Sequence, residues 1–306
     1  MHNYSTTQDI LMNEYRRKPS WLKVRLPSGE GYNQIQLQLR RFNLHTVCEE
    51  ALCPNICECW NSGTLTFMLM GDTCTRSCRF CNVKSGDPGG KLDPSEPMNV
   101  AKVVEKLRLK YVVLTSVDRD DIPDGGAGHF AETIRAIKGI DGDVIVEALI
   151  PDFQYNIEAL RKVVEAGPDV IGHNIETVER LSSKVRDPRA SYRGSLNVLR
   201  SVKMMNPKIY TKSSLMLGLG EREDEVLKAM RDLREAQVDI LTLGQYLQPS
   251  KRHLPVVEYV HPERFEYFKK KGEELGFLYV ASNPLVRSSY KSIEYFSIIK
   301  GRCKGG

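Results

Sequence analysis

Three cysteines within eight residues constrain this chain more than any other feature. Cys74, Cys78 and Cys81 stand at C-x3-C-x2-C spacing, directly after the apolar run 64–70 and a Gly-Asp pair. The apolar run predicts a strand, so the thiols lie in a loop at a strand end, where α/β proteins place functional residues. Three such thiolates suit a 4Fe–4S cluster with one iron open to a further ligand. Phe80, beside Cys81, would shield that cluster from water.

Two other interpretations of this loop are a zinc knuckle and a disulfide pair. Zinc in a structural site takes four ligands, and the residues that follow, 82–86, offer no further Cys or His. An open coordination position, in contrast, is typical of a catalytic metal site.

The loop resembles a known signature. C-x3-C-x-F-C, with Arg79 before Phe80 here, is similar to the motif of the radical S-adenosylmethionine (SAM) enzymes. In that superfamily the three cysteines hold three irons, and SAM chelates the fourth through its amino and carboxylate groups. The resemblance therefore implies SAM as a co-substrate and Cys74, Cys78 and Cys81 as catalytic ligands.

Composition places the chain among soluble globular proteins. Its 306 residues are 41% hydrophobic and 27% charged, and the mean hydropathy is −0.37. No apolar run approaches the roughly 20 residues that span a bilayer, so we expect no membrane association. Residues 1–9 lack a signal pattern, and Asp9 and Glu14 argue against a transit peptide. These observations predict a cytoplasmic protein.

Charge and cysteine usage narrow the class further. The net charge of +5 is mild, and the basic clusters 16–18 and 269–271 are typical of solvated faces, so we expect no nucleic-acid partner. Seven of the eight cysteines lie between residues 48 and 81, which favours metal ligation over a disulfide framework. The eighth, Cys303, stands in a Gly/Lys tail and is interpreted as an incidental thiol.

Strands and helices alternate from residue 64 onward. Strands are expected at 64–70, 110–116, 143–149, 169–175, 209–217 and 238–244, and helices at 96–108, 128–138, 155–166, 191–204 and 222–236. Strands rich in Val, Ile and Leu, each followed by a helix, predict an α/β fold with a buried parallel sheet. Six such units predict a partial (βα)6 barrel, with its site at the C-terminal strand ends.

The flanking segments complete the predicted organisation. Residues 1–63 form an N-terminal extension with a helix over 32–44, and residues 64–250 form the barrel. Residues 251–306 form a short C-terminal extension with a helix over 262–275 and a strand over 277–281.

A second cysteine group precedes the barrel. Cys48, Cys53 and Cys59 stand at C-x4-C-x5-C, and Cys57 lies inside the same stretch. Three or four thiols within a dozen residues would hold a second iron–sulfur cluster. The four thiols would equally satisfy a tetrahedral structural zinc ion, and spacing alone leaves both open.

The two cysteine groups together resemble the lipoyl synthase family. Further similarity to that family covers about residues 20–290 and includes the runs 115–121, 217–221, 244–250 and the R-S-S-Y stretch 287–290. The resemblance implies that Cys48, Cys53 and Cys59 bind an auxiliary 4Fe–4S cluster, with Ser289, or else Ser288, as an unusual fourth ligand. Serine oxygen is a poorer ligand for iron than thiolate, so such a cluster can be dismantled.

Cys57 departs from what that family's motif requires, and leaves the ligand set slightly open. Without the cysteines, Arg287–Tyr290 would be interpreted as a solvated turn.

Polar residues at successive strand ends are the candidate SAM contacts. The set is Thr115, Asp118, Glu147, Asn174, Glu176, Lys212, Gly218, Gly220 and Tyr246. Hydroxyl, carboxylate and amide groups suit the methionyl and ribose groups of SAM, and glycines permit close backbone approach to adenine. Any single member could instead be a helix cap or a surface residue. His45 and His173 are given no role.

The resemblance also implies an activity and partners. The expected reaction inserts two sulfurs at C6 and C8 of an octanoyl chain carried on a lysine of a lipoyl carrier domain or H protein. A ferredoxin- or flavodoxin-type donor would supply electrons, and an iron–sulfur carrier protein would rebuild the auxiliary cluster. The alternatives are another radical SAM sulfur inserter, a two-cluster electron carrier and a zinc-stabilised binding module.

Overall fold

An eight-stranded sheet forms the centre of the protein in the computed structural model, which describes residues 18–24, 29–61, 63–140, 144–290 and 292. Its strand order is β1-β2-β5-β6-β7-β8-β9-β10. The strands are β1 (His45–Thr46), β2 (Leu65–Leu69), β5 (Tyr111–Ser116), β6 (Ile145–Leu149), β7 (Val170–Gly172), β8 (Tyr210–Leu217), β9 (Ile240–Gln245) and β10 (Tyr279–Ser282).

The sheet is parallel except at one edge. The six predicted strands pair in sequence order and in parallel, and β10 pairs with β9 as a further parallel strand. β1 pairs antiparallel with β2, placing His45 opposite Met68. The predicted α/β partial barrel is confirmed, and the seventh parallel strand extends it.

One predicted strand is longer than the observed one. The pattern predicts a strand over 169–175, but β7 ends at Gly172. Regular pairing is interrupted there and resumes as one isolated parallel bridge between Glu176 and Leu215 of β8, where Glu176 adopts a left-handed backbone with φ 65°. Of the residues after Gly172, His173, Asn174 and Glu176 line the central cavity described below.

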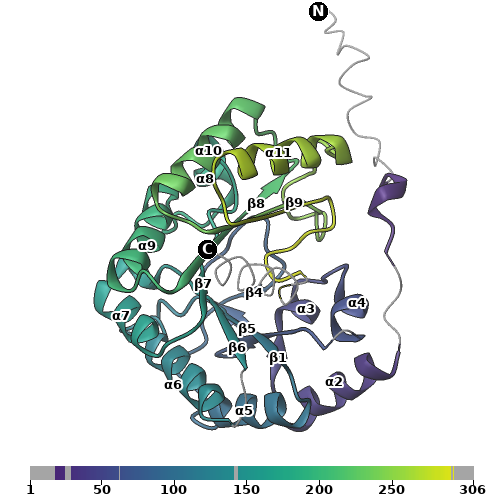
Figure 1. Ribbon diagram of the computed structural model, residues 1–306. Helices are drawn as coiled ribbons and strands as arrows, with labels where there is room; N and C mark the ends of the chain where they lie inside the picture. The colour runs from purple at the N-terminus through teal and green to yellow at the C-terminus, as the bar shows by residue number, and fades with distance from the viewer. Residues whose placement is uncertain (1–17, 25–28, 62, 141–143, 291, 293–306) are drawn as a thin grey trace, which may run out of the picture.

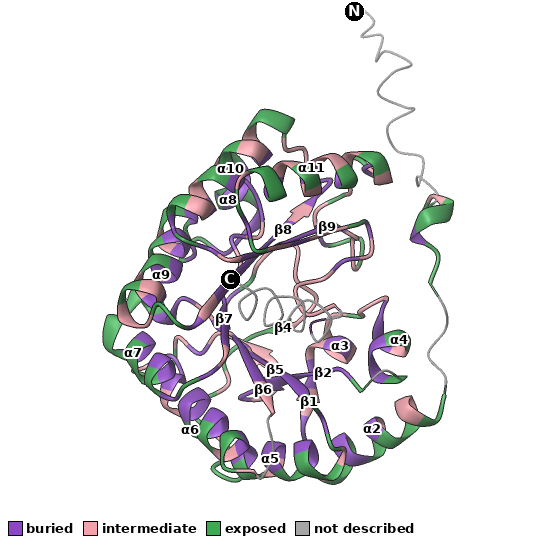
Figure 2. Cartoon of the chain, viewed as in Figure 1, coloured by how far each residue is buried: buried purple, intermediate pink, exposed green. Residues whose placement is uncertain are grey.

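Helices cover the outer side of the sheet, as Figure 1 shows. They are α5 (Glu96–Lys106), α6 (Ala127–Lys138), α7 (Ile157–Glu165), α8 (Glu179–Val185), α9 (Tyr192–Met205), α10 (Glu223–Glu235) and α11 (Pro262–Glu274). Their exposed residues face outward and their buried residues face the strands (Figure 2). In α7, for example, Ala159, Leu160, Val163 and Val164 are buried at helical spacing. All of these helices except α8 are predicted by the sequence pattern.

The N-terminal segment shares the barrel's core. Ile35, Leu39 and Trp60 belong to the same buried cluster as Leu65 and Phe67 of β2. Ile35 and Leu39 lie in α2 (Glu30–Arg41) and Trp60 lies in α4 (Ile56–Asn61), while α3 (Val47–Glu50) contributes Cys48 to the same cluster. The described part of the predicted N-terminal extension, residues 1–63, therefore packs into the core of the barrel and is not a separate unit.

Helix α2 differs slightly from the predicted range 32–44. It begins after Gly29 and ends at Arg41, because Asn43 turns into the left-handed region with φ 51°. The short α3 carries Cys48, α4 carries Cys57 and Cys59, and Cys53 lies between them; both helices have too few residues to show a helical period.

Candidate active site

The loop that carries the first cysteine triad closes over the C-terminal ends of the strands. Cys74, Cys78 and Cys81 all line one cavity of about 510 Å³. The loop is closed at its base by a two-stranded ladder of β3 (Thr73–Cys74) and β4 (Lys84–Ser85). Phe80 lines the same cavity and packs against the core beneath α10 and α11.

Backbone amides surround the sulfurs of this triad. The amide N–H groups of Arg76 and Asp118 donate to the Cys74 sulfur at 3.4 and 3.3 Å, and that of Asp187 donates to the Cys78 sulfur at 3.3 Å. Burial raises the pKa of Cys74 and Cys78 to about 12 and that of Cys81 to about 11. The metal-free thiols are therefore protonated, and the amides suit the thiolates that metal binding creates.

Arg76 anchors the loop to two strand ends. Its guanidinium is buried and lies 2.6 Å from Asp152, 2.9 Å from Asp120 and 3.4 Å from Asp118. Asp118 and Asp120 follow β5, whereas Asp152 follows β6, so one side chain fixes the loop against both strands. Burial raises the pKa of Asp118 to about 6.

The second cysteine triad opens onto the same cavity. Cys48 and Cys53 line it together with the first triad, and Cys48, Cys53 and Cys59 also line a small adjoining cavity. Burial, and then the charges of Cys53 and Cys59, raise the pKa of Cys48 to about 12. The three thiols are thus close enough to influence one another's ionisation.

The R-S-S-Y stretch lies against this second triad. Thr66 of β2 donates a 3.0 Å hydrogen bond to the Ser289 hydroxyl, and the Tyr290 hydroxyl donates to Glu58 of α4 at 3.0 Å. Ser289 lines both the large and the small cavity, whereas Ser288 lines only the large one. The placement favours Ser289 over Ser288 as the fourth ligand of this site.

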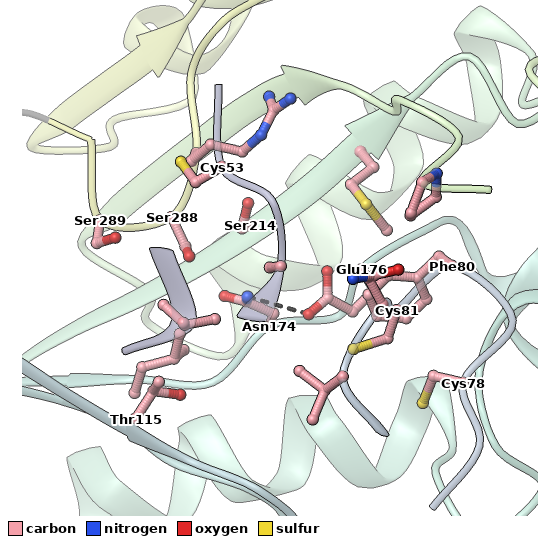
Figure 3. A pocket seen from close by; sticks show the side chains of 18 of the residues that line it. Cys53, Cys78, Phe80, Cys81, Thr115, Asn174, Glu176, Ser214, Ser288 and Ser289 are labelled. Atoms are coloured by element: carbon pink, nitrogen blue, oxygen red, sulfur yellow. Dashed lines mark hydrogen bonds between the residues drawn. The ribbon is translucent and has the colours of Figure 1, made fainter. Parts of the chain in front are cut away.

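Figure 3 shows the two sides of the large cavity. Cys53, Ser288 and Ser289 lie on one side, and Cys78 and Cys81 lie on the other. Asn174 and Glu176 lie between the two groups, joined by a hydrogen bond of 3.0 Å from the Asn174 amide to the Glu176 carboxylate.

Cys57 is separated from this arrangement. It lines neither cavity, and Asn61 of the same helix donates to its sulfur at 3.6 Å. Two residues apart on α4, Cys57 and Cys59 fall on different faces of the helix. Cys59 therefore joins the triad, as the spacing C-x4-C-x5-C predicts.

Each triad offers three thiols, the donors that an iron–sulfur cluster would need. In the described part of the chain, no group of three or more His, Cys, Asp and Glu side chains is arranged to hold a single metal ion. A 4Fe–4S cluster instead binds each thiolate through a different iron. The fit to clusters accordingly rests on three thiols sharing a cavity wall, on the amides that face the first triad, and on Ser289 beside the second.

Five of the nine predicted SAM contacts line the large cavity, namely Thr115, Asp118, Asn174, Glu176 and Tyr246. Burial raises the pKa of Glu176, while the positive charge of Arg186 opposes the shift. The Tyr246 hydroxyl donates to the Leu254 carbonyl at 2.7 Å, so it holds the chain that follows β9.

The other four predicted contacts lie apart from the cavity lining. Lys212 and Glu147 form an ion pair of 2.7 Å inside the barrel, and Tyr111 donates to the same carboxylate at 2.6 Å. All three side chains are buried. Gly218 and Gly220 shape the turn after β8: a Cβ on Gly218 would lie 2.2 Å from the Gln245 side chain. SAM contact by these four residues stays a prediction without a cavity contact to support it.

Sequence reasoning missed three residues of the site. Arg186 is buried and lines the cavity, and its charge lowers the pKa of Asp118 against the effect of burial. One ring nitrogen of His253 shares a hydrogen bond with the Ser250 hydroxyl, and the other bonds the Cys81 carbonyl at 2.9 Å. This second bond fixes the end of the first triad. Arg287 lines both cavities. Only Arg287 carried a sequence signal, because it opens the R-S-S-Y stretch.

His173, to which the sequence analysis gives no role, has both ring nitrogens engaged. They bond the Ile150 carbonyl at 2.9 Å and the Ser195 hydroxyl at 2.8 Å. Burial lowers its pKa to about 4, so the ring is neutral at physiological pH.

Comparison with known proteins defines the family. Models of the radical SAM superfamily and of the N-terminal domain of lipoyl synthase match residues 68–233 and 2–53. Lipoyl synthase of Thermus thermophilus is 58% identical over 281 residues, which cover 92% of this chain and 87% of the relative. The chain belongs to the lipoyl synthase family. It is a radical SAM enzyme, and the resemblance noted in its sequence is confirmed.

Other members of the lipoyl synthase family come from organelles. A mitochondrial lipoyl synthase of Drosophila grimshawi is 57% identical over 94% of this chain and 81% of the relative. An apicoplast lipoyl synthase of Plasmodium vivax is 55% identical over 92% of this chain and 63% of the relative.

Solved structures support the fold assigned to this lipoyl synthase family member. Streptococcus suis SuiB bound to S-adenosylmethionine superposes with a TM-score of 0.56 at 6% identity, over 83% of this chain and 56% of SuiB. Methylornithine synthase (PylB) superposes with a TM-score of 0.53 at 13% identity, over 78% of this chain and 81% of the PylB chain. Among the helices described here, none is both long and apolar enough to cross a membrane.

Proposed function

We propose that this protein inserts two sulfur atoms, at C6 and C8, into an octanoyl chain on a lysine of a lipoyl carrier domain or H protein. The observation that carries the proposal is that one cavity is lined by all three cysteines of the first triad and by Cys48 and Cys53 of the second. A radical generated at one wall can then meet a substrate held against the other. Unactivated methylene C–H bonds lie beyond acid–base chemistry, since no side chain approaches the required basicity.

The first triad, Cys74, Cys78 and Cys81, is proposed to hold a 4Fe–4S cluster. When bound, it supplies the electron that splits SAM into methionine and a 5′-deoxyadenosyl radical. In this proposal Thr115 and Asp118, near the end of β5, bind the methionyl group, and Asn174 and Glu176 bind ribose hydroxyls; the support is that all four line the cavity. Arg186 adds a buried positive charge suited to the SAM carboxylate.

The second triad, Cys48, Cys53 and Cys59, with Ser289, is proposed to hold a second 4Fe–4S cluster that is consumed as a substrate. Its sulfides would become the two sulfur atoms of the product, one SAM being spent on each C–H bond. Thr66 orients the Ser289 hydroxyl through its hydrogen bond. A serine ligand binds iron less tightly than a thiolate, which suits a cluster that must come apart.

The remaining wall of the cavity suits an acyl chain. Its apolar side chains are Val47, Leu52, Met68, Leu149, Ile150, Leu215, Met216, Leu247 and Val286. Such a wall would exclude water and align an octanoyl chain between the two triads.

The partners in this proposal follow from the reaction. They are the octanoylated carrier, a ferredoxin- or flavodoxin-type electron donor and an iron–sulfur carrier protein that restores the second cluster, without nucleic acid or membrane. A cytoplasmic location stays a prediction, since relatives include mitochondrial and apicoplast forms.

Mass spectrometry of an octanoylated carrier peptide, after anaerobic incubation with SAM and reductant, tests the function. We expect Cys74→Ala to abolish 5′-deoxyadenosine formation. Cys53→Ala should still form 5′-deoxyadenosine but give no thiolated peptide. Cys57→Ala is the matched control and should keep both, because Cys57 lines neither cavity. Lipoyl product from the Cys53 variant would contradict the assignment of the sulfur donor.

A further inference from the structure

Arg287 is a half-buried cation beside the second triad. It lines both cavities, and its Nη1 donates to the Val286 carbonyl at 2.7 Å and to the Pro284 carbonyl at 3.4 Å. No ion pair within the described residues involves it, whereas Arg76 faces three carboxylates. A guanidinium stays charged under all physiological conditions, so a nearby negative charge would stabilise this half-buried one.

The second triad can supply that charge. Arg287 shares the small cavity with Cys48, Cys53 and Cys59, and it is the only Lys or Arg among the described residues that line it. Cys48, Cys53 and Arg287 also line the large cavity together, so the guanidinium accompanies these thiols in both cavities.

We propose that Arg287 is the resident counter-cation of the Cys48–Cys53–Cys59 site, where it stabilises thiolate ligation and favours the reduced form of the bound cluster. The role is that of a positioning residue and rests on the function proposed above. Net charge and hydrogen bonds near a cluster set its reduction potential. A fixed positive charge in a site of low polarity stabilises whichever oxidation state carries more negative charge.

The backbone around Arg287 is arranged to keep it there. Gly244 at the end of β9 lies so close that a Cβ would meet the Val286 carbonyl oxygen at 2.0 Å and Nη1 of Arg287 at 3.4 Å. The Pro284 carbonyl, which accepts from Arg287, also accepts from the Gln245 amide at 3.1 Å. The sheet therefore positions the turn that carries the guanidinium.

The test isolates the second site in the full-length chain. In a parent with Cys74, Cys78 and Cys81 all replaced by alanine, only the second cluster can bind. Arg287→Gln and Arg287→Lys are compared with this parent by redox titration followed by electron paramagnetic resonance, and by the rate at which a chelator removes iron. Arg193→Gln is the control, because that arginine is on the surface, with its side chain 83% exposed.

Arg287→Gln is expected to lower the equilibrium constant for one-electron reduction about tenfold, a shift of about 59 mV to lower potential. It should also lose iron several-fold faster. Arg287→Lys should restore most of both values, because it keeps the charge, and Arg193→Gln should change neither.

Three results would overturn this role. The first is that Arg287→Gln changes neither the reduction potential nor the rate of iron loss. The second is that Arg287→Lys and Arg287→Gln change these values equally, which would show that charge is not the relevant property. The third, a parent that binds no cluster at all, would overturn the proposed function as well. The first two leave that function standing, so the two failures are distinguishable.

Discussion

Thr66 donates a 3.0 Å hydrogen bond to the Ser289 hydroxyl, although 223 positions separate the two residues along the chain. Thr66 lies in β2, beside the second triad, and Ser289 lies in the R-S-S-Y stretch near the other end of the sequence. The bond holds the proposed oxygen ligand against the cavity wall that carries the thiols.

Replacing Thr66 by valine should weaken the second site. Thr66→Val keeps the shape but removes the donor to Ser289, and a hydrogen bond of this kind contributes about 1 kcal/mol. We expect a chelator to remove iron from the second cluster about fivefold faster. Thr242→Val is the control, since that buried hydroxyl has no hydrogen-bond partner among the described residues. Equal rates in the two variants would show that Thr66 does not support the ligand.

Gly244→Ala should displace the R-S-S-Y stretch. A Cβ at Gly244 would lie 2.0 Å from the Val286 carbonyl oxygen, and the neighbour is backbone that cannot simply rotate away. We expect a loss of about 1–3 kcal/mol in the free energy of unfolding, measured with urea on metal-free protein. The second cluster should be lost before the first.

Gly139→Ala is the matched control for that substitution. Its Cβ would lie 3.4 Å from the Arg135 carbonyl oxygen, and Gly139 has a helical backbone with φ −79°. If both glycine variants behaved alike, the close approach at Gly244 would have no effect on the site.

The Glu147–Lys212 pair should stabilise the barrel rather than bind SAM. Lys212→Met leaves the Glu147 carboxylate buried without its cation, which costs about 3–5 kcal/mol of unfolding free energy. Adding Glu147→Gln should recover most of that loss. Calorimetry on the folded variants should find SAM affinity changed less than twofold. Weaker SAM binding without loss of stability would instead support the contact that the sequence predicts.

The first triad should resist alkylation in metal-free protein. Burial disfavours the thiolate, and so raises the pKa of Cys74 and Cys78 to about 12 and that of Cys81 to about 11. At pH 8 a thiol with such a pKa is thiolate in only about one part in 10³–10⁴, against about one in four for a free thiol. Reaction with iodoacetamide should therefore be slow at pH 8 and rise through pH 11.

Mass spectrometry of the alkylated peptides measures this, and the same protein in urea supplies the control. Unfolding exposes the thiols and should accelerate their alkylation at pH 8 by two orders of magnitude or more. If the alkylation rate of the folded protein reached half of its maximum below pH 9, the effect of burial on these thiols would be contradicted.

Most strands and helices of the barrel could be predicted from local sequence patterns. Six parallel strands and five of the helices between them follow from runs of Val, Ile and Leu and from helical spacing, which depend on near neighbours in the chain. α8 was missed because its seven residues, Glu179–Val185, are too few to show a period. Residues 173–176 follow a strand-like pattern, but regular pairing stops at Gly172 and returns as a single bridge at Glu176, and the side chains of Asn174 and Glu176 line the cavity.

By itself, the sequence determined the fold class, the two cysteine triads and the family, because strand pattern and thiol spacing are properties of short stretches. Tertiary structure alone decided which polar residues reach the cavity. Thr115, Asp118, Asn174, Glu176 and Tyr246 line it, whereas Glu147 and Lys212 pair within the barrel. It also placed Arg287 beside Cys53 and Thr66 beside Ser289. Such neighbours come from segments more than 200 positions apart, and no local pattern encodes which side chains the sheet will bring together.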